Sequence, residues 1–243
     1  GENAFANWAS LTSVTIPDSV TTIGASAFAN CSALATVSFG SGLKTIGNSA
    51  FTKTALSGEL KLPASLEEIG DSAFSNCTSI TKVNIPDTVT KIGYAAFSFN
   101  SGTEKVTIPY GEIEYGTDND GKAYVFSMYG ENSALKTVVL GSTPENVDAN
   151  TLFANSLAKI EYLVLGAGVT GITDWAFSAT PTTLKGGLYP STLSFDSSHT
   201  QLDDKATKFT LATETGLTYG STLQMMEFTK PDGGEDVSGK IAY

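Results

Sequence analysis

The residues best suited to chemistry in this sequence are one histidine, His199, and two cysteines, Cys31 and Cys77. A histidine-based triad needs a scaffold that holds the imidazole beside a nucleophile, whereas His199 lies in a stretch rich in serine and aspartate. No glycine-rich phosphate loop follows a candidate strand, and no residue spacing is typical of a metal site. We therefore predict no catalytic residue, no cofactor and no metal, and we expect His199 to be a solvated loop residue.

Two aspartates followed by a glycine resemble part of a calcium-binding loop. Residues 117–124 read TDNDGKAY and contain Asp118, Asp120 and Gly121. An EF-hand loop needs a further acidic ligand and a bidentate glutamate at its twelfth position, but the twelfth residue from Asp118 is Tyr129. An Asp-Gly turn is the better interpretation, and we expect it to lie inside an insertion at residues 110–131.

The elements that could position side chains come from an internal repeat. A phenylalanine recurs every 23 residues at Phe5, Phe28, Phe51, Phe74 and Phe97, and the series continues at longer intervals with Phe126, Phe153 and Phe177. A period of roughly 20–50 residues is typical of a solenoid. One such repeat buries too little apolar surface to fold alone, so neighbouring coils must cover each other. We expect Phe28, Phe51, Phe74 and Phe97 to form one buried column.

Within each repeat, an alternating apolar pair predicts a short, half-buried strand. These pairs are Val14/Ile16, Val37/Phe39, Leu60/Leu62, Val83/Ile85, Val106/Ile108, Val138/Leu140 and Leu163/Leu165. Proline directly follows four of the pairs and has no N–H for the ladder, so it should end the strand. A second aliphatic pair and a glycine follow, and we expect positive φ at Gly24, Gly47, Gly70 and Gly93. The next segment, SAF in several repeats, should make one helical or 3₁₀ turn.

The repeat resembles a known family. LTSVTIPDSVTTIGASAFANCSAL closely resembles the BspA-like leucine-rich repeat over roughly residues 4–195. The resemblance implies a β-rich α/β fold: a right-handed solenoid with a parallel sheet of seven to eight short strands and short helical or 3₁₀ turns. It also implies a surface-exposed bacterial protein of a family associated with adhesion to host matrix, epithelium or other microbes. No catalytic residues come with this family.

The last part of the chain departs from the repeat. In residues 206–243, Tyr219-Gly220 precedes STLQMMEF and Ser238-Gly239 precedes KIAY, which resembles the opening strands of a bacterial immunoglobulin-like domain. The alternative is a β-structured cap, because the ends of solenoids need covering. We expect a solenoid at 1–195, a connector at 196–205, and a cap or truncated immunoglobulin-like domain at 206–243.

The repeat also places the cysteines and the carboxylates. Cys31 and Cys77 are two repeats apart, which separates them by roughly 10 Å at the spacing of β-strands, so we expect free, buried thiols. Glu104, Lys136 and Glu161 fall in one column, and Glu59 lies beside Lys82. A glycosidase needs two carboxylates that face one cleft. The interleaved lysines favour a solvated ladder of opposite charges over a glycan-active site.

The composition excludes two classes of partner. The 243 residues carry a net charge of −11, and all fourteen basic residues are lysine. Nucleic acids and anionic membranes bind clustered cations, so we predict neither partner, and no apolar run is long enough to insert into a membrane. Gly1 is not followed by a basic and then apolar leader, so we expect any signal peptide to be missing from this sequence. We expect an extracellular or cell-surface location, with a monomer favoured.

What remains as a candidate site is the outward face of the strands. We predict that a protein or glycoprotein partner binds there, with a hot spot around Tyr162, because an aromatic would lie among exposed valines. The candidate ligand-binding residues are Lys61, Lys82, Asn84, Lys105, Thr107, Thr137, Val139, Tyr162 and Val164. An inert stalk that displays another domain is the alternative function.

Overall fold

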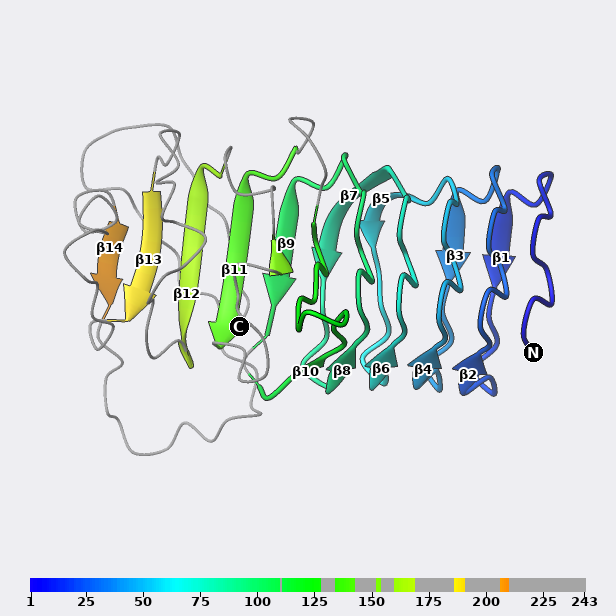
Figure 1. The fold of residues 1–243 in the computed structure, drawn as a ribbon, viewed down its shortest axis with the longest axis horizontal. Coiled ribbons are helices and arrows are strands. Elements are labelled where there is room, and N and C mark those ends of the chain that lie inside the picture. Colours follow the sequence, from blue (N-terminus) through cyan, green and yellow to red (C-terminus); the bar gives the residue numbers. More distant parts are fainter. Residues whose placement is uncertain are drawn as a thin grey trace.

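The computed structural model describes residues 1–109, 111–127, 134–142, 152–153 and 160–168, and the backbone of two further strands at 186–190 and 206–209. Successive coils of the chain stack side by side in sequence order, starting from the N-terminus at one end (Figure 1). The described residues contain parallel strands and tight turns with almost no helix. His199, Phe177 and the residues after Phe209 lie outside the described part.

The predicted strands form two parallel sheets. β1 (Ser13–Thr15) pairs with β3 (Thr36–Ser38), and a seven-stranded sheet follows in the order β5, β7, β9, β11, β12, β13, β14. The bounds in the larger sheet are β5 Ser57–Leu60, β7 Ser79–Asn84, β9 Lys105–Ile108, β11 Thr137–Ser142, β12 Tyr162–Gly168, β13 Gly186–Pro190 and β14 Ala206–Phe209. The repeat therefore gives parallel strands, as expected, although they are divided differently from the single sheet we predicted.

The register of the larger sheet shifts at Gly58. In this repeat Leu56 comes one position earlier after the phenylalanine than its counterparts Leu34 and Ile80 do. The pairing moves from Gly58↔Ile80 to Glu59↔Lys82, which leaves Thr81 as the extra residue. Gly58 has a φ of 72°, a conformation that glycine adopts without steric cost. The shift restores the 23-residue interval for Glu59↔Lys82 and Leu60↔Val83, and the pairing of β7 with β9 keeps it.

A further parallel sheet, which the sequence did not lead us to expect, forms at the second aliphatic pair of each repeat. It is separate from the two sheets above, and we call it the second sheet. Its strands have two residues each, in the order β10, β8, β6, β4, β2. The bounds are β2 Thr22–Ile23, β4 Thr45–Ile46, β6 Glu68–Ile69, β8 Lys91–Ile92 and β10 Glu114–Tyr115. Figure 1 shows these strands along the opposite edge of the stack from β1, β3, β5 and β7.

The predicted helical turn is wrong. From Gly24 onward the chain alternates two kinds of backbone hydrogen bond: Phe28 donates to Ala50 of the next coil at 2.8 Å, whereas Ala29 donates within its own coil to Ser26 at 3.1 Å. The alternation is possible because Ser26 and Asn30 have φ of 54° and 59°. The same two positions have positive φ in all five coils from Asn3 to Phe99. Every second N–H therefore reaches the neighbouring coil.

The prediction of positive φ at the four repeat glycines is also wrong. Positive φ falls on the residue two positions after Gly24, Gly47, Gly70 and Gly93, and these glycines themselves are not in that region. They are needed because the previous coil is too close for a side chain. A Cβ on Gly70 would lie 2.6 Å from the Asn48 nitrogen, and one on Gly47 would lie 2.8 Å from the Ala25 nitrogen.

The core is one continuous stack of apolar side chains. Phe28, Phe51, Phe74 and Phe97 form the predicted column, with ring centroids 5.2–5.3 Å apart and nearly parallel planes. Phe126 and Phe153 extend it at 5.2 and 5.3 Å. Phe5 begins the column but is 44% exposed. The inward members of the strand pairs, such as Val83 and Val106, are fully buried against this column.

In the coil where we predict the insertion, residues up to Gly116 keep the normal interval. β10 pairs with β8 at the normal interval, and Gly116 donates to Ile92 as Gly93 donates to Ile69. The next inter-coil bonds, such as Phe97 to Val125, span six residues more than their counterparts, such as Phe74 to Ala96. Six extra residues therefore lie between Gly116 and Ala123, and the 32-residue interval from Lys105 to Thr137 places three more between Val125 and Thr137. Strand β14 pairs with β13 and extends the seven-stranded sheet by one strand. The nature of residues 210–243 stays a prediction.

Candidate functional site

The outward side chains of the main strands form two rows, which we call the sheet face. Because alternate residues of a strand point to opposite sides, the neighbours of each buried residue on a strand point outward. The first row contains Ser13, Thr36, Glu59, Lys82, Lys105, Thr137 and Tyr162; the second contains Thr15, Ser38, Lys61, Asn84, Thr107, Val139 and Val164. All nine candidate residues belong to this face, with Lys61 directly after the end of β5.

The middle of the sheet face holds a cluster of charged and amide groups. The Lys82 ammonium lies 3.2 Å from Oε1 of Glu59, and the Asn84 amide donates to the same oxygen at 2.9 Å. Glu59 and Lys82 retain 40% and 36% of their side-chain exposure, so solvent weakens the ion pair. The predicted contact between Glu59 and Lys82 is confirmed, and Glu59 is occupied by both neighbours.

Lys105 lies next to this cluster and is not neutralised by it. It is the register partner of Lys82, and its side chain is half-buried. Burial is the main cause that lowers the pKa of Lys105, and the charge of Lys82 lowers it further, while Glu59 acts in the opposite direction. Within the part of the chain that the structure describes, Lys105 forms no ion pair. The ammonium groups of Lys82 and Lys105 are thus on neighbouring strands. Glu59 is the one carboxylate among the outward positions around these two lysines and Lys61.

The apolar end of the sheet face differs from the prediction. Thr107, Thr137 and Tyr162 are half-buried, but Val139 and Val164 are only 4% and 7% exposed. The two valines are register partners, and Thr107 lies beside Val139 on β9, so branched side chains at strand spacing cover one another. The expected exposed apolar hot spot around Tyr162 therefore lacks its exposed valines.

The carboxylate column is built as predicted. Lys136 donates its backbone N–H to Glu104 at 2.9 Å, and Glu161 donates to Lys136 at 2.8 Å, so the three residues occupy successive coils. Lys136 stands between the two glutamates. This order suits a ladder of alternating charges and not a pair of carboxylates that face one cleft.

The Asp118 segment is a tight turn, as expected. The Asp118 carboxylate accepts the backbone N–H groups of Asp120 and Lys122, both at 2.9 Å, and the Asp118 N–H donates to the Lys122 carbonyl at 3.0 Å. Gly121 has a φ of 74°. The carboxylate is thus used to close the turn. Among the described residues, no group of three potential metal ligands comes together.

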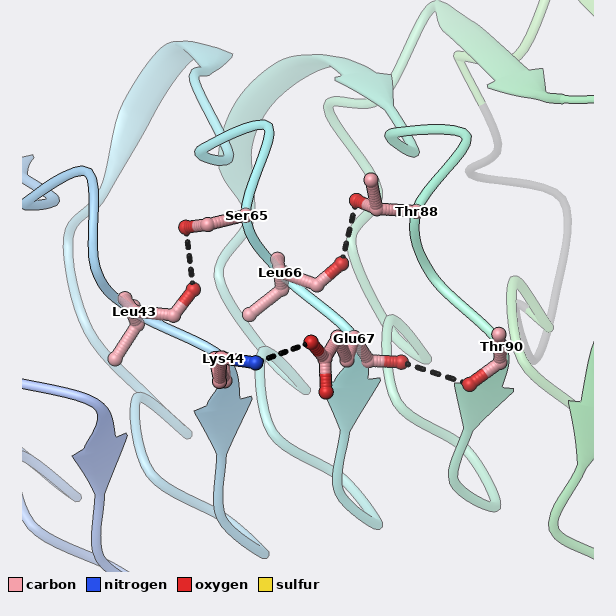
Figure 2. A network of polar contacts seen from close by, with 7 residues as sticks. All are labelled: Leu43, Lys44, Ser65, Leu66, Glu67, Thr88 and Thr90. Carbon is pink, nitrogen blue, oxygen red and sulfur yellow. Dashed lines mark hydrogen bonds and ion pairs between the residues drawn. The ribbon is translucent and has the colours of Figure 1, made fainter. Parts of the chain in front are cut away.

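The second sheet carries polar ladders that sequence reasoning missed. The Lys44 ammonium lies 2.7 Å from Glu67 (Figure 2). The Ser65 and Thr88 hydroxyls each donate at 2.7 Å to a carbonyl of the preceding coil, that of Leu43 and of Leu66 respectively. The signal in the sequence was a polar residue at the same repeat position in neighbouring coils. These contacts join coils to each other.

A further ladder caps the turns beside the second sheet. The Asn48 side-chain oxygen accepts the N–H of Asp71 at 2.9 Å, and the Asp71 carboxylate accepts the N–H of Tyr94 at 2.8 Å. Asp18 does the same for Ser41, whose N–H and hydroxyl lower the pKa of that carboxyl. Several polar residues thus hold the stack together and are not free for a ligand.

Both cysteines are free and buried, as predicted. The thiols of Cys31 and Cys77 each lie 3.1 Å from a backbone carbonyl, that of Phe5 and Phe51. Thr54 occupies the same repeat position in the coil between them and contacts Cys77 at 3.2 Å. Burial raises the pKa of the Cys77 thiol, which disfavours the reactive thiolate. These residues pack and do not form a reactive site.

Fold and repeat together define a parallel β-solenoid of the leucine-rich-repeat class. The family described as "BspA type Leucine rich repeat region" matches this chain in six copies, over residues 1–119 and 59–185. The chain therefore belongs to the BspA-type leucine-rich repeat family, and the predicted resemblance is confirmed.

Several solved structures resemble the chain. A leucine-rich repeat protein from Bacteroides ovatus is 19% identical over 86% of this chain and 63% of that one, with a TM-score of 0.44. The T. pallidum leucine rich repeat protein is 30% identical over 70% and 66%, with a TM-score of 0.49. A leucine rich cell surface protein from Faecalibacterium prausnitzii is 22% identical over 86% and 62%, with a TM-score of 0.38. This chain spans less than two thirds of the B. ovatus and F. prausnitzii structures. No curated protein matches it.

Among the described residues, no helix combines the length and the hydropathy that a membrane crossing requires.

Proposed function

We propose that this chain is a non-enzymatic cell-surface protein that binds a macromolecular partner through its sheet face. The observation that carries the proposal is the sheet face itself, which crosses successive coils from Ser13 to Tyr162. A solenoid presents such an extended surface because its coils repeat. Membership of a leucine-rich repeat family, whose fold is typical of proteins that interact with other proteins, supports the same function.

The contact surface runs over the exposed and half-buried members of the face. It comprises Lys61, Lys82, Asn84, Lys105, Thr107, Thr137 and Tyr162. In this proposal Val139 and Val164 pack within the face and do not contact the partner, because their side chains are buried. Tyrosine suits a contact at the edge of this area, since it offers a large apolar ring with a polar end.

A binding panel tests the proposal. The purified chain is passed over immobilised host extracellular-matrix proteins and over surface extracts of co-resident bacteria, and affinities are measured for each positive signal. We expect Tyr162→Ala together with Lys82→Gln to weaken binding by more than tenfold. Lys91→Gln serves as the matched control, because Lys91 forms a comparable ion pair with Glu114 on the second sheet. If no partner binds at micromolar concentrations, the chain is an inert stalk.

A further inference from the structure

We propose that the partner presents an acidic protein segment, and that its carboxylates bind across Lys82 and Lys105 on β7 and β9. This inference rests on the proposed function and specifies the chemistry of the same sheet face. It concerns one patch, which we call the lysine patch: Lys61, Lys82 and Lys105, with Asn84 and Thr107 beside them.

The lysine patch carries a net positive charge. The chain as a whole carries −11, yet the outward positions of β5, β7 and β9, together with Lys61, contribute three lysines and only Glu59 as a carboxylate. A positive patch on a strongly acidic protein does not follow from composition. It attracts an anionic group, which the acidic surface elsewhere on the chain repels.

The positive charge of the lysine patch is not neutralised by the described residues of the chain itself. Glu59 contacts Lys82 at 3.2 Å and accepts from Asn84 at 2.9 Å, whereas Lys105 has no ion pair among the described residues. Like charges at register partners destabilise a sheet, and burial adds to the cost at Lys105, as the lowered pKa of its ammonium indicates. A carboxylate supplied by a partner offsets both costs.

The spacing of Lys82 and Lys105 on paired strands suits one bound carboxylate. Lys82 and Lys105 are register partners, so their strands are about 4.8 Å apart, and one carboxylate can accept hydrogen bonds from both ammonium groups. Asn84 and Thr107 are register partners in the second row, and Thr137 follows Lys105 in the first row. The Thr107 and Thr137 hydroxyls can therefore hydrogen-bond a second acceptor of the same segment.

The distribution of charge along the sheet face favours an acidic protein segment over a sulfated polysaccharide. A polyanionic chain lying along the solenoid would need cations in many successive coils. Here the sheet face carries uncharged Ser13, Thr15, Thr36 and Ser38 before the lysine patch, and Thr137, Val139 and Tyr162 after it. The exposed carboxylate of Glu104 directly precedes Lys105. A short segment with one or two carboxylates among neutral residues matches this distribution.

Titration of the full chain with defined probes tests the inference. Lysine methyl signals are followed by NMR after ¹³C reductive methylation, while hexaglutamate, hexaglutamine or a heparin hexasaccharide is added. We expect hexaglutamate to shift Lys82 and Lys105 more than Lys44 and Lys91, and hexaglutamine to shift none of them. Lys82→Gln with Lys105→Gln should reduce the affinity for hexaglutamate about tenfold or more, since charge-assisted contacts are lost, whereas Lys91→Gln leaves it unchanged.

Three results would overturn the inference: no shift at millimolar hexaglutamate, equal shifts with hexaglutamine, or tighter binding of heparin than of hexaglutamate. Circular dichroism spectra of the variants verify that these surface substitutions leave the fold intact. The proposed function can survive this failure. If a panel partner loses affinity with Tyr162→Ala but not with the double lysine variant, the sheet face binds and only its acidic specificity is wrong.

Discussion

The small sheet of β1 and β3 and the strands β11 and β12 of the seven-stranded sheet use the same repeat positions in different ways. β1 and β3 have three residues each, their outward Thr15 and Ser38 are exposed, and even the inward Val14 and Val37 are only partly buried. β11 and β12 have six and seven residues, and there the outward valines are 4% and 7% exposed. Alternation along a strand thus tells which face a side chain lies on, but strand length and row neighbours decide how much solvent it meets.

The largest expected effect contrasts the middle of the phenylalanine column with its open end. Phe74 is fully buried between Phe51 and Phe97, so Phe74→Ala should lower the free energy of unfolding by about 3–5 kcal/mol. Phe5 is 44% exposed and stacks on Phe28 within the column, so Phe5→Ala should cost about 1 kcal/mol. Urea unfolding measures both. Equal costs would show that the column does not stabilise the stack.

A second contrast compares two glycines with different reasons to be glycine. Gly70→Ala should destabilise by about 2–3 kcal/mol, because the new Cβ meets the backbone of the previous coil. Gly58→Ala should cost about 1 kcal/mol, because its Cβ meets no atom within 4 Å and only the positive φ is unfavourable. Thermal unfolding of the two variants gives the order. The reverse order would mean that the coils are farther apart than described.

The contrast between the two ends of the sheet face can be tested directly. Val139→Thr places a hydroxyl in a buried row and should cost about 1–2 kcal/mol. Ser38→Thr is made at the same row position on exposed β3 and should stay within about 0.5 kcal/mol of the wild type. Urea midpoints report both changes. A neutral Val139→Thr would mean that the apolar end of the face is open to solvent, as the sequence first suggested.

The smallest expected effect concerns the left-handed turn positions. Asn7, Asn30 and Asn76 hold one of them, whereas Lys53 holds it in the third coil with a φ of 57°. Asparagine tolerates this conformation better than lysine, so Lys53→Asn should stabilise by about 0.5 kcal/mol. Lys61→Asn, outside these positions, serves as the control in the same thermal melts. A destabilised Lys53→Asn would mean that the lysine side chain contributes contacts that outweigh its backbone strain.

Much of the solenoid was predictable because it is periodic. Phenylalanines 23 residues apart must meet if the coils stack, and an alternating pair such as Val83/Ile85 has one buried face at any register. The sequence could not tell that Ser26 and Asn30 would take positive φ, because two left-handed residues give no hydrophobic pattern. It led us instead to a helical turn, and to assign the left-handed conformation to Gly24.

The site was predictable only in part for a related reason. Charge pairs such as Glu59 and Lys82 follow from register alone, so their contact was correctly predicted. The burial of Val139 and Val164 depends on strand length and on what flanks them in the row, and a pattern of single residues does not carry that information. That Lys105 forms no ion pair among the described residues likewise required a structure.

Lysine footprinting of the complex measures directly whether the sheet face binds the partner. A partner identified in the binding panel is added at saturation, the lysines are acetylated, and the rate at each lysine is read by mass spectrometry. We expect protection of Lys61, Lys82 and Lys105, and unchanged rates at Lys44 and Lys91 on the second sheet. Protection of Lys44 and Lys91 with unchanged Lys82 and Lys105 would contradict it.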